Sequence, residues 1–537
     1  MRTKVIQGLS LLLLVLGIVW FISEPGYEPV ITAIAALAGL FSAEFLQKDP
    51  SEEIREVEGG PRTPGLEPVD GGGSRKSIVV LPFDNLSPDP SDSYFADGLT
   101  EELIAELSGL AALRVISRTT ARKLKSTDKD VSTIGTELKV QHVLEGSVRK
   151  AGNDLRITAQ LIDARTDEHL WAERYSGTMD DVFGIQESLA RRIVDHLKVK
   201  LSPEEDDRLA NPRITQTLAY ECHLRAKQHL TEFTAEGIDR AIELLTKALE
   251  IEGPNELLYS TMGHAHTLYL QLGVRLDEAL LSEAEEWATK AFGMNPDSPG
   301  GHVVRGSALW CRGQMQESVE EFKKALRFDP ENSSALAHLA ITAEHAGHIE
   351  AARTYFERLA VVDPMSEGLN PTRSSYYNGE FEVAAEGFRA EWEMDPDSPY
   401  TRWAYGICLA WAGRIEEGIE ILDPIGDDSP STSWGLFARF CVAALQGDKD
   451  RAVAAMTADL EAVGQHQLQF AWMIGSCFAM VGMVDESVAW LRQAMSRGFI
   501  NYPFLAEHDP FLARIRSEPQ VQEVLGEIKK RWEAFQP

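Results

Sequence analysis

Cysteine is scarce in this chain, and the cysteines present form no metal-binding or disulfide pattern. Five occur among 537 residues, and no two of them make a C-x-x-C pair. This spacing argues against a zinc knuckle and against a small fold held together by disulfides. It favours a reducing compartment, although many secreted bacterial domains also lack disulfides.

Basic residues are also few compared with acidic ones. Lysine and arginine number 52 against 83 aspartates and glutamates, which gives a formal net charge of -31. Such a surface repels a phosphate backbone, so we expect no nucleic-acid partner. A strongly acidic surface is typical of a soluble domain that stays away from anionic lipid or that binds basic partners. The length of the chain predicts several domains.

The common catalytic motifs are missing from the sequence. It contains no P-loop, no kinase signature set, no G-x-S-x-G and no H-E-x-x-H. His345 and His348 have Glu344 and Glu350 nearby, but no third protein ligand for zinc can be named. We therefore predict no catalytic residue, no cofactor-binding residue and no metal site, and hence a protein that is not an enzyme.

Long hydrophobic runs are confined to the N-terminal end. Residues 5–22 and 30–46 are each about long enough to cross a bilayer, and a turn-rich loop without lysine or arginine joins them. Basic residues, Arg2 and Lys4 among them, lie outside the two runs. The positive-inside rule then places both ends in the cytoplasm. We predict that residues 1–46 form a transmembrane helical hairpin.

Two other interpretations of this end stay open. A cleaved signal peptide would account for the first run, but no clear A-x-A site follows it and the second run would have no role. A single span, with residues 30–46 lying at the interface, would export the rest of the chain. Residues 47–76 are rich in Gly, Pro and Glu and predict a flexible linker. We expect the inner membrane as the location, with the soluble domains facing the cytoplasm.

Residues 77–205 predict a small α/β domain. In residues 155–163 apolar and polar side chains alternate, as in a half-buried strand. A turn at residues 151–154 joins this strand to another at 140–149. The further elements expected are strands at residues 78–81, 113–117 and 169–175 and helices at 100–110, 131–138 and 181–201.

The stretch after the first strand raises the question of a phosphate site. We predict a turn at Asp97 and Gly98 and a helix capped by Thr100. A phosphate cradle needs several converging backbone N–H groups, usually with two or more glycines and often a lysine. Only one glycine is present, and Asp97, Glu101 and Glu102 would repel an anion. The stretch therefore predicts a turn and a cap.

Several blocks of this domain carry a resemblance to a known family. "VVLPFDNLS", "YFADGLTEELIAELS", "VISRTT" and "VLEGSVRKAGNDLRITAQLIDARTDEHLWAERY" follow one another in order over about residues 77–200. They resemble the TolB amino-terminal-like domain, also called the FlgO-type domain. Members of that family often precede tetratricopeptide repeats and follow a nucleotide cyclase, a protein kinase or a winged-helix domain. The resemblance implies a signalling or interaction module and supplies no catalytic activity.

The rest of the chain has a regular period. Pro296, Pro330, Pro364, Pro396 and Pro430 end successive helical segments at intervals of 34, 34, 32 and 34 residues. A period of 34 is typical of tetratricopeptide repeats, in which each repeat is two antiparallel helices. We predict about seven such repeats over residues 215–500. Residues 501–537 are expected to cap the stack, because "RGFINYPFLAEHDPFLARI" resembles the closing segment of such modules in bacterial signalling proteins.

Tetratricopeptide solenoids bind partners through the face formed by the first helix of each repeat. Aromatic side chains on that face are the expected anchors for a peptide or helix. The alternative is that these tryptophans pack between repeats, which is the commoner fate of a large aromatic side chain. The tryptophans predicted to line a partner-binding groove are Trp310, Trp403, Trp411, Trp434 and Trp472.

The predicted fold is therefore multidomain, with a transmembrane helical hairpin, a small α/β domain and an all-α tetratricopeptide solenoid. The predicted function is a non-enzymatic, membrane-anchored scaffold or signalling adaptor that binds a protein partner. One alternative is an exported envelope-assembly or sensory component. Another is the sensing of a nucleotide or small ligand by the α/β domain.

Overall fold

The structure is a computed structural model that describes residues 75–125, 129–366, 371–396, 398–429 and 432–537. The predicted hairpin, and all but the last residues of the predicted linker, lie outside these ranges. Within the described part, no helix has the length and apolar composition needed to cross a membrane. Contacts group Ser74–Pro537 into one compact unit.

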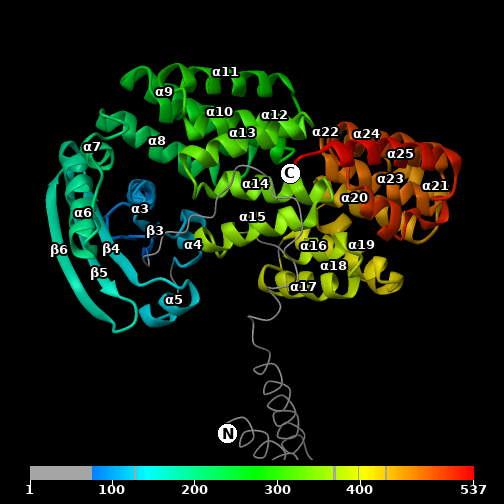
Figure 1. The fold of residues 1–537 in the computed structure, drawn as a ribbon, viewed down its shortest axis with the longest axis horizontal. Coiled ribbons are helices and arrows are strands. Elements are labelled where there is room, and N and C mark those ends of the chain that lie inside the picture. Colours follow the sequence, from blue (N-terminus) through cyan, green and yellow to red (C-terminus); the bar gives the residue numbers. More distant parts are fainter. Residues whose placement is uncertain (1–74, 126–128, 367–370, 397, 430–431) are drawn as a thin grey trace, which may run out of the picture. The chain divides into compact units, whose positions relative to one another are not determined.

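The first part of this unit is a mixed sheet with helices on both faces (Figure 1). The strand order is β3-β1-β4-β5-β6, and the short β2 pairs with β4. β1 is parallel to β3 and β4, while β5 is antiparallel to β4 and β6. The strands are β1 Lys76–Val80, β2 Asp84–Asn85, β3 Leu113–Val115, β4 His142–Ala151, β5 Asp154–Asp163 and β6 Glu168–Thr178.

Side chains along each strand point alternately to the two faces of the sheet, and each face packs against a different set of helices. In β5, Leu155 and Ile157 are buried while Arg156 between them is exposed. The buried side chains belong to a core that α3 and α6 complete, whereas Val79 of β1 points into a second, smaller core with α5. The helices of this part are η2 Pro90–Asp92, α3 Ser93–Ser108, α4 Arg118–Lys123, α5 Val131–Glu137, η3 Met179–Asp181, α6 Val182–Leu197 and α7 Pro203–Ala210.

The predicted turn and cap at residues 97–100 are wrong. Asp97, Gly98 and Thr100 all lie inside α3, which begins at Ser93. The helical region begins before the predicted position because of Asp89. Its carboxylate accepts a hydrogen bond from the Ser91 N–H and caps the short helix η2, which leads directly into α3. The Thr100 hydroxyl instead donates to the Ala96 carbonyl (2.9 Å) and accepts from the backbone N–H of residue 83 (3.0 Å), which ties α3 to the sheet.

The second part is a series of antiparallel helix pairs, so the predicted tetratricopeptide-like solenoid with a small sheet domain is confirmed. The turn inside a pair often carries a glycine at positive φ, such as Gly313 (78°) and Gly347 (74°), where a side chain would be strained. Asp329 and Asp363 end second helices just before a proline, which gives the observed period.

The pairs are α8 Thr217–Leu230 with α9 Ala235–Glu252, α10 Glu256–Gln271 with α11 Ala279–Met294, α12 Pro299–Cys311 with α13 Met315–Phe328, α14 Ser333–His345 with α15 Ile349–Val362, α16 Pro371–Tyr377 with α17 Phe381–Met394, α18 Pro399–Trp411 with α19 Ile415–Asp428, α20 Ser433–Leu445 with α21 Lys449–Ala455, and α23 Leu468–Met480 with α24 Val484–Ser496. The remaining helices are α22 Ala458–His466, η4 Phe504–His508, η5 Leu512–Arg514 and α25 Pro519–Ala534.

The sheet domain packs directly on the first helix pair, along α3 and α8. A Cβ atom at Gly98 would lie 2.6 Å from Cδ1 of Leu224, so only glycine permits this approach. Beside it, the Lys150 ammonium pairs with Glu221 of α8 (2.8 Å) and with Asp92 (3.2 Å). Burial alone would lower the pKa of Lys150, but its hydrogen bonds to Glu221 and Tyr94 outweigh burial and raise it.

A second contact joins the sheet domain to the fourth helix pair. The backbone N–H of Ser117 donates to the Val362 carbonyl (2.7 Å), and the Thr120 hydroxyl donates to the Asp363 carboxylate (2.7 Å). Thr120 and Asp363 are both almost completely buried. With contacts at the first and fourth pairs, the sheet domain is fixed to the solenoid at two separated places.

We predict that Gly98→Ala destabilises the protein by about 1–3 kcal/mol, because Leu224 is only 2% exposed and has little room to move away from the added methyl group. Thermal unfolding of the two proteins measures the difference. Gly184→Ala on the exposed face of α6 is the matched control, since nothing lies within 4 Å of its added Cβ. The control should gain roughly 0.5–1 kcal/mol from helix propensity. Equal melting temperatures for wild type and Gly98→Ala would contradict the close approach.

Candidate functional site

All five tryptophans of the predicted groove lie on first helices of pairs, but their exposure differs. Three of them, Trp403, Trp411 and Trp472, are between 1% and 5% exposed. Trp310 on α12 and Trp434 on α20 are half-buried. The structure therefore separates the predicted set into buried members and members that keep some contact with solvent.

Four of the five come together in two pairs. The rings of Trp411 and Trp472 are stacked with centroids 5.9 Å apart, and those of Trp403 and Trp434 are 5.2 Å apart. Trp310 instead lies near His338 (6.2 Å) and His345 (6.4 Å) of α14. The predicted residues thus form a broken row along the solenoid rather than one cluster.

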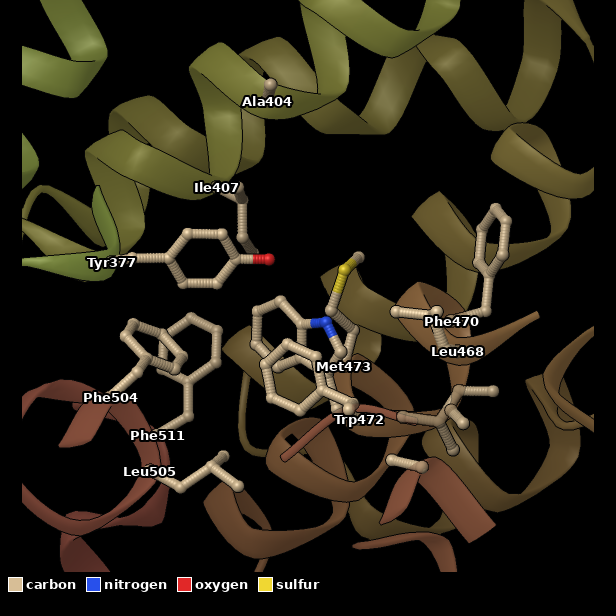
Figure 2. Close-up of a cluster of buried hydrophobic side chains, with 14 of the residues drawn as sticks. Tyr377, Ala404, Ile407, Leu468, Phe470, Trp472, Met473, Phe504, Leu505 and Phe511 are labelled. Atoms are coloured by element: carbon tan, nitrogen blue, oxygen red, sulfur yellow. The ribbon is translucent and has the colours of Figure 1, made fainter. Parts of the chain in front are cut away.

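Residues 499–515, which we call the closing segment, cover two of the three buried tryptophans, Trp411 and Trp472. Figure 2 shows Phe504 and Phe511 of this segment beside Trp472. The Phe499 ring stacks on Trp472 at 4.9 Å, the Phe504 ring meets Trp472 edge-on at 5.4 Å, and the Phe511 ring lies 6.0 Å from Trp411. Phe499 and Phe504 are fully buried. The chain itself therefore occupies the face on which a partner was expected.

Hydrogen bonds to backbone carbonyls of α14 fix the closing segment to this helix. The Ile500 N–H donates to the His345 carbonyl (3.2 Å), and the Asn501 side-chain amide donates to the Glu344 carbonyl (3.0 Å). Farther on, the His348 imidazole donates to the Trp532 carbonyl on α25 (3.3 Å). A segment from the end of the array thus lies against its fourth helix pair.

The histidines considered as metal ligands have other surroundings. His345 is 6% exposed among aromatic rings, and burial lowers its pKa to about 3. Glu344 is fully buried, and its carboxylate accepts from the Ser374 hydroxyl (2.6 Å) and lies 3.3 Å from Nε of Arg373. Burial raises the pKa of Glu344 although Arg373 opposes this. No three His, Cys, Asp or Glu side chains converge as a metal site in the described ranges.

Two family models match separate parts of the chain. One describes a tetratricopeptide repeat and matches residues 303–367. Helix pairs of the same kind lie on both sides of the matched residues, so this half of the chain is a tetratricopeptide-like solenoid. The other describes the second domain of HilA/YgeH-like transcriptional regulators and matches residues 74–193. The resemblance of the sheet domain to TolB is not shown by these matches and stays a prediction.

Curated relatives match about half of the chain. Putative adenylate cyclase 3 of Rhizobium meliloti (strain 1021) is 36% identical over 265 residues, which are 49% of this chain and 44% of that protein. Transcriptional regulator HilA of Salmonella typhimurium is 21% identical over 319 residues, 52% of this chain and 55% of that protein. The chain thus spans about half the length of these relatives, whose names describe whole proteins.

Solved structures align with parts of this chain at low identity and low TM-score. Yeast Tom70 aligns with 65% of this chain and 82% of its own, at 15% identity and a TM-score of 0.35. YrrB, described as a TPR protein with an unusual peptide-binding site, aligns with 36% of this chain and 96% of its own, at 21% identity and a TM-score of 0.26. At these scores the likeness carries no argument about function.

We predict that Trp411→Ala destabilises the protein by about 3–5 kcal/mol, because it removes a buried ring and leaves a cavity between α18 and the closing segment. Urea unfolding followed by circular dichroism measures the loss. Trp392→Ala on the second helix α17 is the control, since Trp392 is half-buried and should cost much less. A smaller loss for Trp411→Ala than for Trp392→Ala would contradict the packing role.

Proposed function

We propose that this protein is a non-enzymatic, membrane-anchored adaptor that binds a protein partner through its solenoid. The observation that carries the proposal is the array of tetratricopeptide helix pairs, an architecture whose exposed faces suit peptides and helices. The sheet domain packs on this array at two places, so a signal received by one part can affect the other. The membrane anchor rests on the hydrophobic runs at residues 5–22 and 30–46.

Within the predicted groove, we assign partner contact to Trp434 and Trp310. Both are half-buried, so each presents part of its ring to a partner. Trp434 is also held firmly, since its ring packs 4.8 Å from Phe470 and 5.3 Å from Tyr400. A rigid, partly exposed aromatic ring is the kind of residue that anchors an interface. Trp403 packs against Trp434, whereas Trp411 and Trp472 pack against each other and the closing segment.

We predict that a photo-crosslinking phenylalanine analogue at position 434 or 310 captures a discrete partner in living cells. The analogue replaces one large ring by another, so the packing against Phe470 is retained. The measurement is the appearance of a heavier band after irradiation, followed by mass spectrometry. The matched control carries the analogue at position 392, where the half-buried Trp392 lies on a second helix.

The positions that give crosslinks show whether the partner binds to the first helices or to the second helices of the pairs. Capture at positions 434 and 310 but not at 392 supports the assigned face. Capture of the same protein at 392 alone would move the binding surface to the second helices. Absence of any crosslinked band at all three positions would count against a stable protein partner.

We further propose that the anchor is a hairpin and that the described domains face the cytoplasm. Support comes from the lack of lysine and arginine between the two hydrophobic runs, together with Arg2 and Lys4 before them. The competing proposal is a single span with the body exported as an envelope or sensory component. The two differ in the side on which helix α21 lies.

We predict that Asp450→Cys reacts with a membrane-impermeant maleimide only after the inner membrane has been permeabilised. Asp450 is exposed on α21, whereas all five native cysteines are buried, so the new thiol is the accessible one. The unsubstituted protein is the control and should stay unlabelled in the folded state. Labelling of Asp450→Cys in intact spheroplasts would show an exported body and exclude the hairpin.

A further inference from the structure

A pocket lies at the junction between the sheet domain and the first helix pair. It has a volume of about 110 Å³, and it is lined by α3, α4 and α8. Its floor includes Ile104 and Leu224, and its polar lining includes Arg118, Arg122 and Lys227. Asp97, Gly98, Thr100 and Glu101 of α3 also line it, where the sequence had predicted a turn at the first two residues and a cap at the third. A cavity of this size holds a group as large as phosphate or a carboxylate.

The carboxylates that line the pocket are already paired with neighbouring cations. Glu101 accepts from Arg118 of α4 (2.9 Å) and pairs with Lys227 of α8, and Asp97 pairs with Lys125 (2.5 Å). Lys227 also lies 3.8 Å from Glu102. Arg122 is exposed at the pocket, with no hydrogen bond or ion pair of its side chain among the described residues. The pocket therefore contains a cation that is available to a ligand.

Cations outnumber carboxylates among the residues that line the pocket. Arg118, Arg122 and Lys227 stand against the two carboxylates of Asp97 and Glu101. Next to Lys227, His223 on α8 is fully buried, and its Nδ1 has no hydrogen-bond partner among the described residues. Burial lowers the pKa of His223, and Lys227 lowers it further. The lining of the pocket is thus more cationic than acidic, in a chain whose formal net charge is -31.

We propose that this pocket binds a small oxyanion, a phosphate or carboxylate group, with Arg118, Arg122 and Lys227 as its cationic ligands. Arginine and lysine donate strong charge-assisted hydrogen bonds to such oxygens. Gln228 of α8 also lines the pocket, and its side-chain amide adds a neutral donor. The sequence pointed away from an anion at this stretch because it showed only the acidic residues of α3, whereas the cations come from α4 and α8.

The position of the pocket gives the ligand a structural effect. Arg118 and Arg122 belong to the sheet domain, and Lys227 belongs to the first helix pair. An anion held by both sides links them, and any ligand that binds only the folded state stabilises it in proportion to its occupancy. Binding is therefore expected to strengthen the attachment of the sheet domain to the solenoid.

The test uses the full chain in detergent and measures binding by calorimetry and by the shift in melting temperature. The probes are inorganic phosphate, adenosine monophosphate and citrate, each against sodium chloride of equal ionic strength. We expect saturable binding of at least one probe. Arg122→Gln should weaken that binding about tenfold, which corresponds to about 1.4 kcal/mol. Because Arg122 has no partner to lose, this variant should keep the stability of the wild type.

Arg149→Gln is the matched control, since Arg149 is likewise exposed and without an ion pair in the described ranges, but lies on β4 away from the pocket. It removes the same charge and should bind as the wild type does. Binding of phosphate alone would identify a free-phosphate site, of the nucleotide alone a nucleotide site, and of citrate alone a carboxylate site. Equal weakening by Arg122→Gln and Arg149→Gln, or no binding of any probe, would overturn the proposal.

Discussion

The contact between the closing segment and the Trp411–Trp472 stack holds the second half of the solenoid together. A helix pair cannot bury its own apolar face, and in a repeat array the next repeat normally supplies the cover. For Trp411 of α18 and Trp472 of α23, part of the cover comes from Phe499, Phe504 and Phe511 of the closing segment. The rings of Trp411 and Trp472 are thus part of the hydrophobic core, and the proposed partner contact falls on Trp434 and Trp310.

The attachment of the sheet domain is the second constraint. It combines a steric fit, in which Gly98 admits Leu224, with a buried ion pair of Lys150 and Glu221. Removing Lys150 would take this cation away from both Glu221 and Asp92, which costs more than the net gain from the pair. The sheet domain and the solenoid therefore belong to one compact unit, and a ligand at their junction would act on both.

The sequence was sufficient to predict those features that depend on residues close to one another along the chain. The alternation in residues 155–163 predicted β5, and the spacing of Pro296, Pro330 and Pro364 predicted the helix pairs. It was insufficient where the decisive neighbour is distant. Gly98 looked like a turn residue because Leu224 is far away in sequence, and the burial of Trp472 depends on Phe499. The cations around Glu101 were missed for the same reason.

The return of the chain end onto earlier pairs changes how the array can unfold. Arg497, just after α24, pairs with Glu278 before α11 (2.9 Å), in addition to the bonds that join Ile500 and Trp532 to the fourth pair. An open array has only nearest-neighbour interfaces, so it can fray one repeat at a time from either end. Here the last pair cannot fray without also breaking contacts with the second and fourth pairs. Cooperativity in this solenoid is therefore a property of the whole array, and partial unfolding from the C-terminal end carries a larger free-energy cost than in an open array.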